Sequence, residues 1–241
     1  MTTWGEHHWI IEDNTVRQVN AVAIEIGAFI DELSGSGDQE VLEMRTGGHL
    51  VRGNHVSACG WQEVQSYLGT GDIKILLALD LVVQCNHIHH CYAAPGIWID
   101  FANRNSWVCR NLLHDITVAN GGIFFEGSKP QQIDHNIIYS VEGLRHFQQD
   151  CDRLLIDHNL MQNNGAAGLR MREIQHLDRV GVCKNDHVVN NIIAGCLTTF
   201  DYEIMENISN YNLLSNIGEA FSLSEWQATG LDTDSRMVKI D

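Results

Sequence analysis

Short runs of alternating apolar and polar residues recur along the chain, and most of them lie next to an Asn that is itself followed by apolar residues. Alternation with a period of two predicts β-strands, because successive side chains of a strand point to opposite faces of a sheet. The β-rich stretches that precede the asparagines include WII, LVV, WVC, LLI and HVV. The recurring asparagines are Asn14, Asn54, Asn86, Asn111, Asn136, Asn159, Asn191 and Asn212.

The spacing of these asparagines predicts a solenoid. Successive intervals are 40, 32, 25, 25, 23, 32 and 21 residues, and a unit of roughly 20–25 residues is too small to bury its own apolar face unless units stack. We therefore predict an all-β fold, a right-handed parallel β-helix of about eight coils that forms one domain over residues 1–241. A leucine-rich solenoid is the main rival, but its LxxLxL framework is absent.

The recurring asparagines are expected at an inward turn. There the amide of each Asn can pair with the same amide one coil away, and its backbone tolerates left-handed angles. The longer intervals predict insertions near residues 28–48 and 172–186.

The second strand of each coil, aligned on its small first residue, separates into an inward and an outward face. The predicted inward columns are Ile24, Ile73, Ile97, Ile123, Leu144 and Leu169, and then Ile26, Ile75, Ile99, Phe125, His146 and Met171. The predicted outward columns are Glu25, Lys74, Trp98, Phe124, Arg145 and Arg170, and then Gly27, Leu76, Asp100, Glu126, Phe147 and Arg172.

Two carboxylates occupy equivalent outward positions on adjacent coils, Asp100 in GIWID and Glu126 in GIFFE. Parallel strands lie about 4.8 Å apart, and a retaining glycosidase needs two carboxyl groups about 5–5.5 Å apart. Trp98 and Phe124 are expected to offer aromatic faces to a sugar beside these acids. The residues predicted to bind substrate are Lys74, Trp98, Phe124, Arg145, Arg170 and Arg172.

The run NHIHHCYAAPGIWIDFANRNSWVCRNLLHD, followed by GGIFFEGS, resembles the catalytic coils of glycoside hydrolase family 120, the β-helical β-xylosidases. HHWIIEDNTVRQVNAVAIEIG is similar to a coil upstream of that site. The resemblance implies that Asp100 is the nucleophile and Glu126 the acid/base, with a xylo-oligosaccharide or related glycoside as substrate and no cofactor. It also implies a polar residue, often His, two places after Lys74, where this chain has Leu76.

Two other function classes fit the same pattern. A polysaccharide lyase or epimerase would use Arg145, Arg170 and Arg172 around a uronate carboxylate, and calcium dependence with an unsaturated product would identify a lyase. A non-catalytic glycan-binding solenoid would keep its function when the carboxylates are replaced. Fold analogy alone cannot choose among them.

The composition of the chain argues against nucleic acids and membranes as partners. Fifteen basic and 31 acidic residues give a formal charge of −16, which argues against nucleic-acid binding. No apolar run is long enough to cross a membrane, and no secretory leader opens the sequence. The seven cysteines have no CxxC pair or zinc-type spacing, which is typical of free thiols in a reducing compartment and favours the cytoplasm.

Two histidine clusters, HIHH (His87, His89 and His90) and GEHH (His7 and His8), raise the question of a metal. No further ligand is fixed by the spacing, so we expect turn or surface histidines and no metal site. His135 and His158 each precede a recurring Asn and are expected to stack. Unpaired strand edges at the two ends of a short solenoid predict homo-oligomerisation or a further domain.

Overall fold

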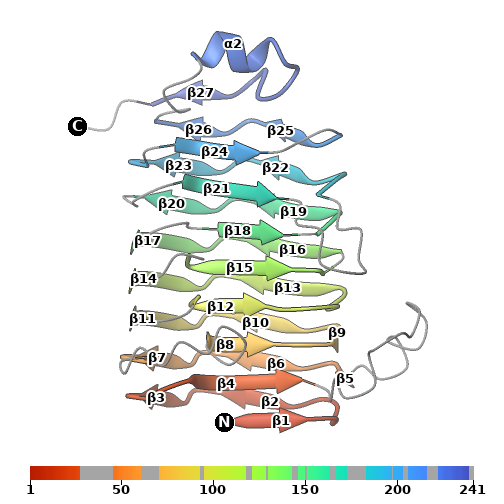
Figure 1. The fold of residues 1–241 in the computed structure, drawn as a ribbon, viewed down its shortest axis with the longest axis vertical. Coiled ribbons are helices and arrows are strands. Elements are labelled where there is room, and N and C mark those ends of the chain that lie inside the picture. Colours follow the sequence, from red (N-terminus) through yellow and green to blue (C-terminus); the bar gives the residue numbers. More distant parts are fainter. Residues whose placement is uncertain are drawn as a thin grey trace.

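The computed structural model describes residues 1–27, 46–60, 71–92, 95–117, 121–128, 130–142, 146–149, 151–162, 167–172, 183–196, 198–202, 206–215 and 222–238. These residues form a parallel β-helix whose successive coils stack along the long axis of the molecule (Figure 1). Successive coils contribute strands to three long parallel sheets of 8, 8 and 9 strands, which we name sheets A, B and C in the order in which the chain visits them.

The strands of sheet A are β1 (Thr2–Trp4), β4 (Val22–Gly27), β8 (Gly71–Ile75), β12 (Ile97–Ile99), β15 (Ile123–Glu126), β18 (His146–Gln149), β21 (Ala167–Arg172) and β24 (Thr198–Tyr202). The strands of sheet B are β2 (Ile10–Glu12), β6 (Leu50–Arg52), β10 (Val82–Gln84), β13 (Ser106–Cys109), β16 (Gln131–Asp134), β19 (Leu154–Asp157), β22 (His187–Val189) and β25 (Ile208–Asn210).

The strands of sheet C are β3 (Thr15–Arg17), β7 (His55–Ser57), β11 (His87–Cys91), β14 (Leu112–Thr117), β17 (Ile137–Glu142), β20 (Leu160–Gln162), β23 (Ile192–Ala194), β26 (Leu213–Leu214) and β27 (Arg236–Met237). A small fourth sheet pairs β5 (Thr46–Gly47) with β9 (Ala78–Leu79). The helix α2 (Leu223–Gln227) begins in a capping box at Ser222 and Glu225 and lies at the C-terminal end of the stack (Figure 1).

The core lies between the three sheets and is lined by one buried face of each. On sheet A the predicted inward residues Ile73, Ile97 and Ile123 are fully buried and stacked in register. Val83 and Val108 of sheet B and Ile88 and Leu113 of sheet C complete the same layers. The predicted fold is therefore confirmed, and the alternation of the strands fixes which side chains face the core.

The asparagine ladder is also confirmed. Each recurring Asn donates its side-chain amide to the side-chain oxygen of the next one, and six such bonds in a row have lengths of 2.9–3.0 Å, followed by one of 3.2 Å. The same amide group also bonds a backbone carbonyl, as Asn111 does to Val83 at 3.0 Å. The ladder thus pairs amides that would otherwise be buried unsatisfied.

The predicted left-handed backbone lies one residue earlier than expected. The positive φ belongs to the residue before each ladder Asn, for example Cys85 (55°), Arg110 (54°) and His135 (53°), and not to the Asn. The corner between sheets B and C is two residues long in every coil. Its first residue reverses the chain and its second directs the amide inward, so the Asn keeps an ordinary conformation.

The predicted columns of sheet A are wrong at one coil. His146, and not Leu144, is paired with Ile123 and Leu169, and Phe147, and not Arg145, is paired with Phe124 and Arg170. Gln149 therefore takes the place beside Glu126 that Phe147 was expected to occupy. A shift of two residues keeps every side chain on its own face, so the hydrophobic pattern alone cannot detect it.

Several expectations fall on other parts of the chain. Most of the two predicted insertions, and Leu144 and Arg145, lie outside the described residues. All seven cysteines are free thiols. Within the described residues, no helix is both long and apolar enough to span a membrane.

Candidate functional site on the outer face of sheet A

Asp100 and Glu126 follow paired residues on neighbouring strands. Ile99 is paired with Phe125; Asp100 directly follows β12, and Glu126 is the last residue of β15. The parallel hydrogen bonding continues through Asp100, whose amide donates to the carbonyl of Ile75 at 2.8 Å. The Asp100 side chain is 15% exposed, and Glu126 is half-buried. The structure therefore places both predicted catalytic carboxylates on adjacent coils, at the C-terminal ends of two neighbouring strands of sheet A.

Lys74 lies against Asp100 and away from solvent. Its Nζ is 3.1 Å from Oδ2 of Asp100, and its side chain is only 4% exposed. The other carboxylate oxygen, Oδ1, accepts a hydrogen bond of 2.7 Å from the amide of Phe101. Lys74 was expected to bind sugar hydroxyls, but this burial makes it the ion-pair partner that orients Asp100.

Trp98 and Phe124 lie on the outer face as predicted, but they do not form an open platform. They are 3% and 2% exposed, and their ring centroids are 5.4 Å apart. Nζ of Lys74 lies 3.8 Å from the centroid of the Trp98 ring, which is the geometry of a cation–π contact. Large rings on this face gain more from packing than from exposure. The Trp98 Nε1–H is buried and has no acceptor among the described residues.

The corner that follows the acids is fixed by two polar residues that sequence reasoning missed. The Ser128 hydroxyl lies 2.9 Å from the carbonyl oxygen of Asp100 and 3.0 Å from that of Glu126, so it bridges the two coils. The side chain of Asn103 donates to the carbonyls of Asp100 and Ile75. Both residues are fully buried. In the sequence, Ser128 in EGS and Asn103 in FAN each follow an acid within three residues, and this position could have identified them.

The three arginines predicted to bind substrate have different outcomes. Arg170 lies on β21, two strands beyond Phe124 in the same row, and is partly exposed. Arg172 is paired with Gln149 in the row of the acids. Arg145 lies outside the described residues.

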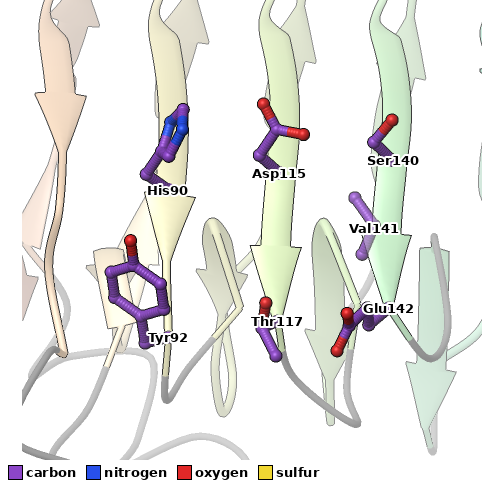
Figure 2. A pocket seen from close by; sticks show the side chains of 7 residues that line it. All are labelled: His90, Tyr92, Asp115, Thr117, Ser140, Val141 and Glu142. Carbon is purple, nitrogen blue, oxygen red and sulfur yellow. The ribbon is translucent and has the colours of Figure 1, made fainter.

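The outer face of sheet C carries a second group of polar residues. An open hollow of about 510 Å³ is lined by side chains of three neighbouring strands: His90, Tyr92, Asp115, Thr117, Ser140, Val141 and Glu142 (Figure 2). Asp115 lies between His90 and Ser140 along this row (Figure 2). A serine nucleophile would need the histidine in the middle, so this order does not make a Ser-His-Asp triad.

Burial shifts the pKa of several titratable groups away from Asp100 and Glu126, among them His87, His89 and Asp72. On sheet C, burial and the neighbouring imidazoles lower the pKa of His89 to about 4 and lower that of His87. At the start of β8, burial raises the pKa of Asp72 to about 7, although the thiols of Cys91 and Cys59 donate hydrogen bonds that oppose this shift. At neutral pH the two imidazoles are therefore neutral.

Comparisons with known proteins identify the fold. A protein-family description, right handed beta helix region, matches residues 2–145. No curated protein matches the chain. The periplasmic alginate epimerase AlgG is similar in structure over 90% of this chain and 46% of its own, with 12% identity and a TM-score of 0.66. XylC, solved with xylose, aligns over 97% of this chain and 48% of its own, with 17% identity and a TM-score of 0.49. The chain thus spans about half the length of these proteins, and the likeness to AlgG establishes a common architecture.

Proposed function

Because this chain belongs to the right-handed β-helix family, we propose that the outer face of sheet A is the active site of a retaining glycoside hydrolase acting on β-xylosides or related glycosides. One observation carries the proposal: Asp100 and Glu126 directly follow the paired residues Ile99 and Phe125. Their backbones are therefore one strand spacing apart, about 4.8 Å. A retaining mechanism needs its two carboxyl groups about 5–5.5 Å apart, whereas an inverting one needs a wider gap for water.

In this proposal Asp100 is the nucleophile. Lys74 and the Phe101 amide each contact one oxygen of Asp100 and so hold the carboxylate that must attack the anomeric carbon. Glu126 donates a proton to the leaving oxygen as the bond to the anomeric carbon breaks. Glu126 then takes a proton from water, which attacks the glycosyl ester of Asp100 and releases the sugar with retained configuration.

The surrounding residues receive roles that follow from their burial. Lys74 is a positioning residue, and the buried ring of Trp98 packs against it. Arg170 lies on β21, two strand spacings or about 10 Å from β15, the strand of Glu126. It is assigned to a neighbouring sugar unit. Arg172, whose backbone pairs with Gln149 in the row of the acids, and Arg145 keep the substrate-binding role predicted from the sequence.

The proposal is tested with Glu126→Ala on aryl β-xylosides, arabinosides and glucosides. The variant should lose about 10²–10⁴-fold in turnover, and azide should restore it because azide attacks the glycosyl ester without a general base. Glu142→Gln, which removes a charge from the exposed edge of sheet C, is the matched control and should act like the wild type. Equal activity of Glu126→Ala and wild type would refute the assignment. An unsaturated product from a polyuronate would replace it with a lyase.

A further inference from the structure

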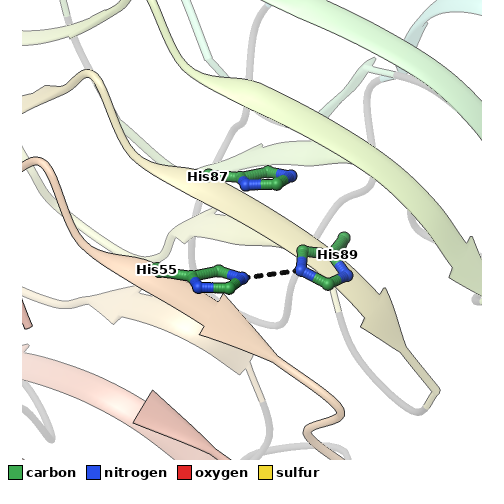
Figure 3. Close-up of side chains that lie close together, drawn as sticks. All are labelled: His55, His87 and His89. Atoms are coloured by element: carbon green, nitrogen blue, oxygen red, sulfur yellow. Dashed lines mark hydrogen bonds between the residues drawn. The ribbon is translucent and has the colours of Figure 1, made fainter. Parts of the chain in front are cut away.

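Four histidines form a compact group on the outer face of sheet C. His55 of β7 is paired with His87 of β11, and His89 of β11 is paired with His114 of β14. Since His87 and His89 are two residues apart on one strand, the four side chains occupy two adjacent rows on three neighbouring coils. Figure 3 shows three of these rings gathered above the strands. We call His55, His87, His89 and His114 the histidine group.

The ring nitrogens of the histidine group converge. Nε2 of His55 lies 2.7 Å from Nε2 of His89, and Nε2 of His87 lies 2.8 Å from Nε2 of His114. One ring nitrogen from each of His55, His87 and His89 lies within 4.8 Å of the others. Four nitrogens around a tetrahedral zinc ion at about 2.0–2.1 Å would be about 3.3–3.4 Å apart; His55, His87 and His89 already offer three nitrogens close together, and His114 joins them through its contact with His87.

A repeated backbone feature places a carboxylate behind this group. His90 and Asp115 have positive φ values of 55° and 52°, and at this position two consecutive residues of each strand face outward, as in a β-bulge. Asp115 consequently reaches Nδ1 of His114 at 2.7 Å. That contact requires the proton on Nδ1, which leaves Nε2 of neutral His114 as a lone-pair donor. Carboxylates hold metal-binding histidines in the same way.

The pair His135 and His158 differs. Their rings are stacked at 5.1 Å, but the polar contact of Nδ1 in each ring is with the Asp before it and not with the other ring. In the histidine group, by contrast, ring nitrogen faces ring nitrogen at 2.7 and 2.8 Å. Each of these contacts shares one proton between two ring nitrogens, and a metal ion would bind both nitrogens in its place.

We propose that His55, His87, His89 and His114 bind one divalent transition-metal ion of the zinc class through their ring nitrogens. Neutral imidazoles suit Zn²⁺, and four protein ligands make a closed, structural site. The ion would join three consecutive coils of sheet C. The open hollow beside the group, which begins at His90 and Asp115, gives the ion a path from solvent.

The experiment is calorimetric titration of the full chain with Zn²⁺, followed by thermal unfolding. We expect one ion per chain and a rise in Tm of about 5–10 °C at a free concentration 100 times the Kd. Co²⁺ in the same site should give the strong visible absorption of tetrahedral coordination. His89→Asn and His114→Asn should each weaken Zn²⁺ binding at least about tenfold, and Asp115→Asn about 10–100-fold.

Three control variants separate this site from other metal-binding groups. His135→Ala/His158→Ala, His7→Ala/His8→Ala and Cys85→Ser should bind Zn²⁺ as the wild type does. Circular dichroism of each variant without metal checks that it folds, and the Co²⁺ spectrum of the wild type tests the site without any substitution. The proposal would be overturned if the wild type bound Zn²⁺ no more tightly than His89→Asn does. An octahedral Co²⁺ spectrum, or loss of Zn²⁺ binding in a control variant, would also overturn it.

Discussion

The corners on the two sides of sheet C differ sharply. Between sheets B and C the corner has two residues in every coil, and the second of them is always an Asn. Between sheets C and A the corner varies from 3 residues (Glu142 to His146) to 13 (Ser57 to Gly71). Both corners connect parallel strands, yet one of them repeats and the other does not.

The difference teaches where this solenoid fixes its register and where it allows variation. A constant corner with a continuous amide ladder holds sheets B and C coil by coil, so rows such as the histidine group stay aligned. Sheet A enters each coil through a corner of variable length. Loops of variable length beside a rigid scaffold are where binding sites usually form. The four predictions below test this division of roles.

The largest effect is expected for Asp100→Asn on sheet A. Removal of the nucleophile should lower turnover of aryl β-xylosides by at least about 10³-fold, whereas Glu142→Gln at the edge of sheet C should leave it within twofold. Steady-state kinetics measures both. Comparable activities of the two variants would place the chemistry elsewhere.

Next is Asn111→Ala in the constant corner. The change removes the amide oxygen that accepts from Asn86 and the amide group that donates to Asn136 and to the Val83 carbonyl, while Asn86 and Asn136 each keep one ladder bond, to Asn54 and Asn159. At about 1–3 kcal/mol for each buried unsatisfied group, we expect a loss of about 3–5 kcal/mol in the free energy of unfolding. Asn14→Ala, at the more exposed end of the ladder, should cost about 1 kcal/mol. Urea denaturation gives both values, and equal costs would contradict a ladder stabilised by burial.

The third prediction concerns Asp72, at the variable corner. Its folded pKa of about 7 exceeds the ordinary value of about 3.9, so folding favours the protonated form. That contribution is complete below about pH 4 and is lost as the pH rises to about 7, at up to ~1.4 kcal/mol per pH unit. Asp72→Asn should therefore gain stability relative to the wild type between pH 5 and pH 7.5, by about 2–3 kcal/mol. Parallel stability curves for the two proteins would disprove this.

The smallest effect is expected for Lys74→Met. Asp100 would lose its ion-pair partner, but it would keep the hydrogen bond from the Phe101 amide and its 15% exposure to solvent. We therefore expect the free energy of unfolding to fall by about 1–3 kcal/mol, which is less than the loss of a partner costs in a fully buried pair. Turnover should fall while KM changes little, because Lys74 acts through Asp100. Restored turnover in Lys74→Arg would support a role in orientation. A raised KM alone would instead indicate that Lys74 contacts substrate.

Much of the fold was predictable because its determinants are local. Alternation assigned the inward residues Ile73, Ile97 and Ile123 correctly, and the recurring Asn identified the ladder. The recurring Asn also predicted that Asp100 and Glu126 lie on adjacent coils. Asn86, Asn111 and Asn136, which flank the two acids in the sequence, are each 25 residues apart.

What the sequence missed depends on backbone geometry. The register of β18 differs by two residues because β18 begins at His146, two residues later than the alignment on Gly143 assumed, and alternation is blind to such a shift. The histidine group was missed because two ligands lie on other coils and because consecutive outward residues, such as His89 and His90, break the alternation. The burial of Lys74, Trp98 and Phe124 depends on tertiary packing that a strand pattern does not report.

The central claim, that Asp100 and Glu126 form a retaining catalytic pair on sheet A, is tested most directly by the configuration of the first product. Proton NMR of an aryl β-xyloside during early turnover by the wild-type chain should show the β-anomer of the free sugar first, with the α-anomer appearing only by mutarotation. The α-anomer as the first product would mean inversion and a carboxyl separation wider than one strand spacing, and it would contradict the account.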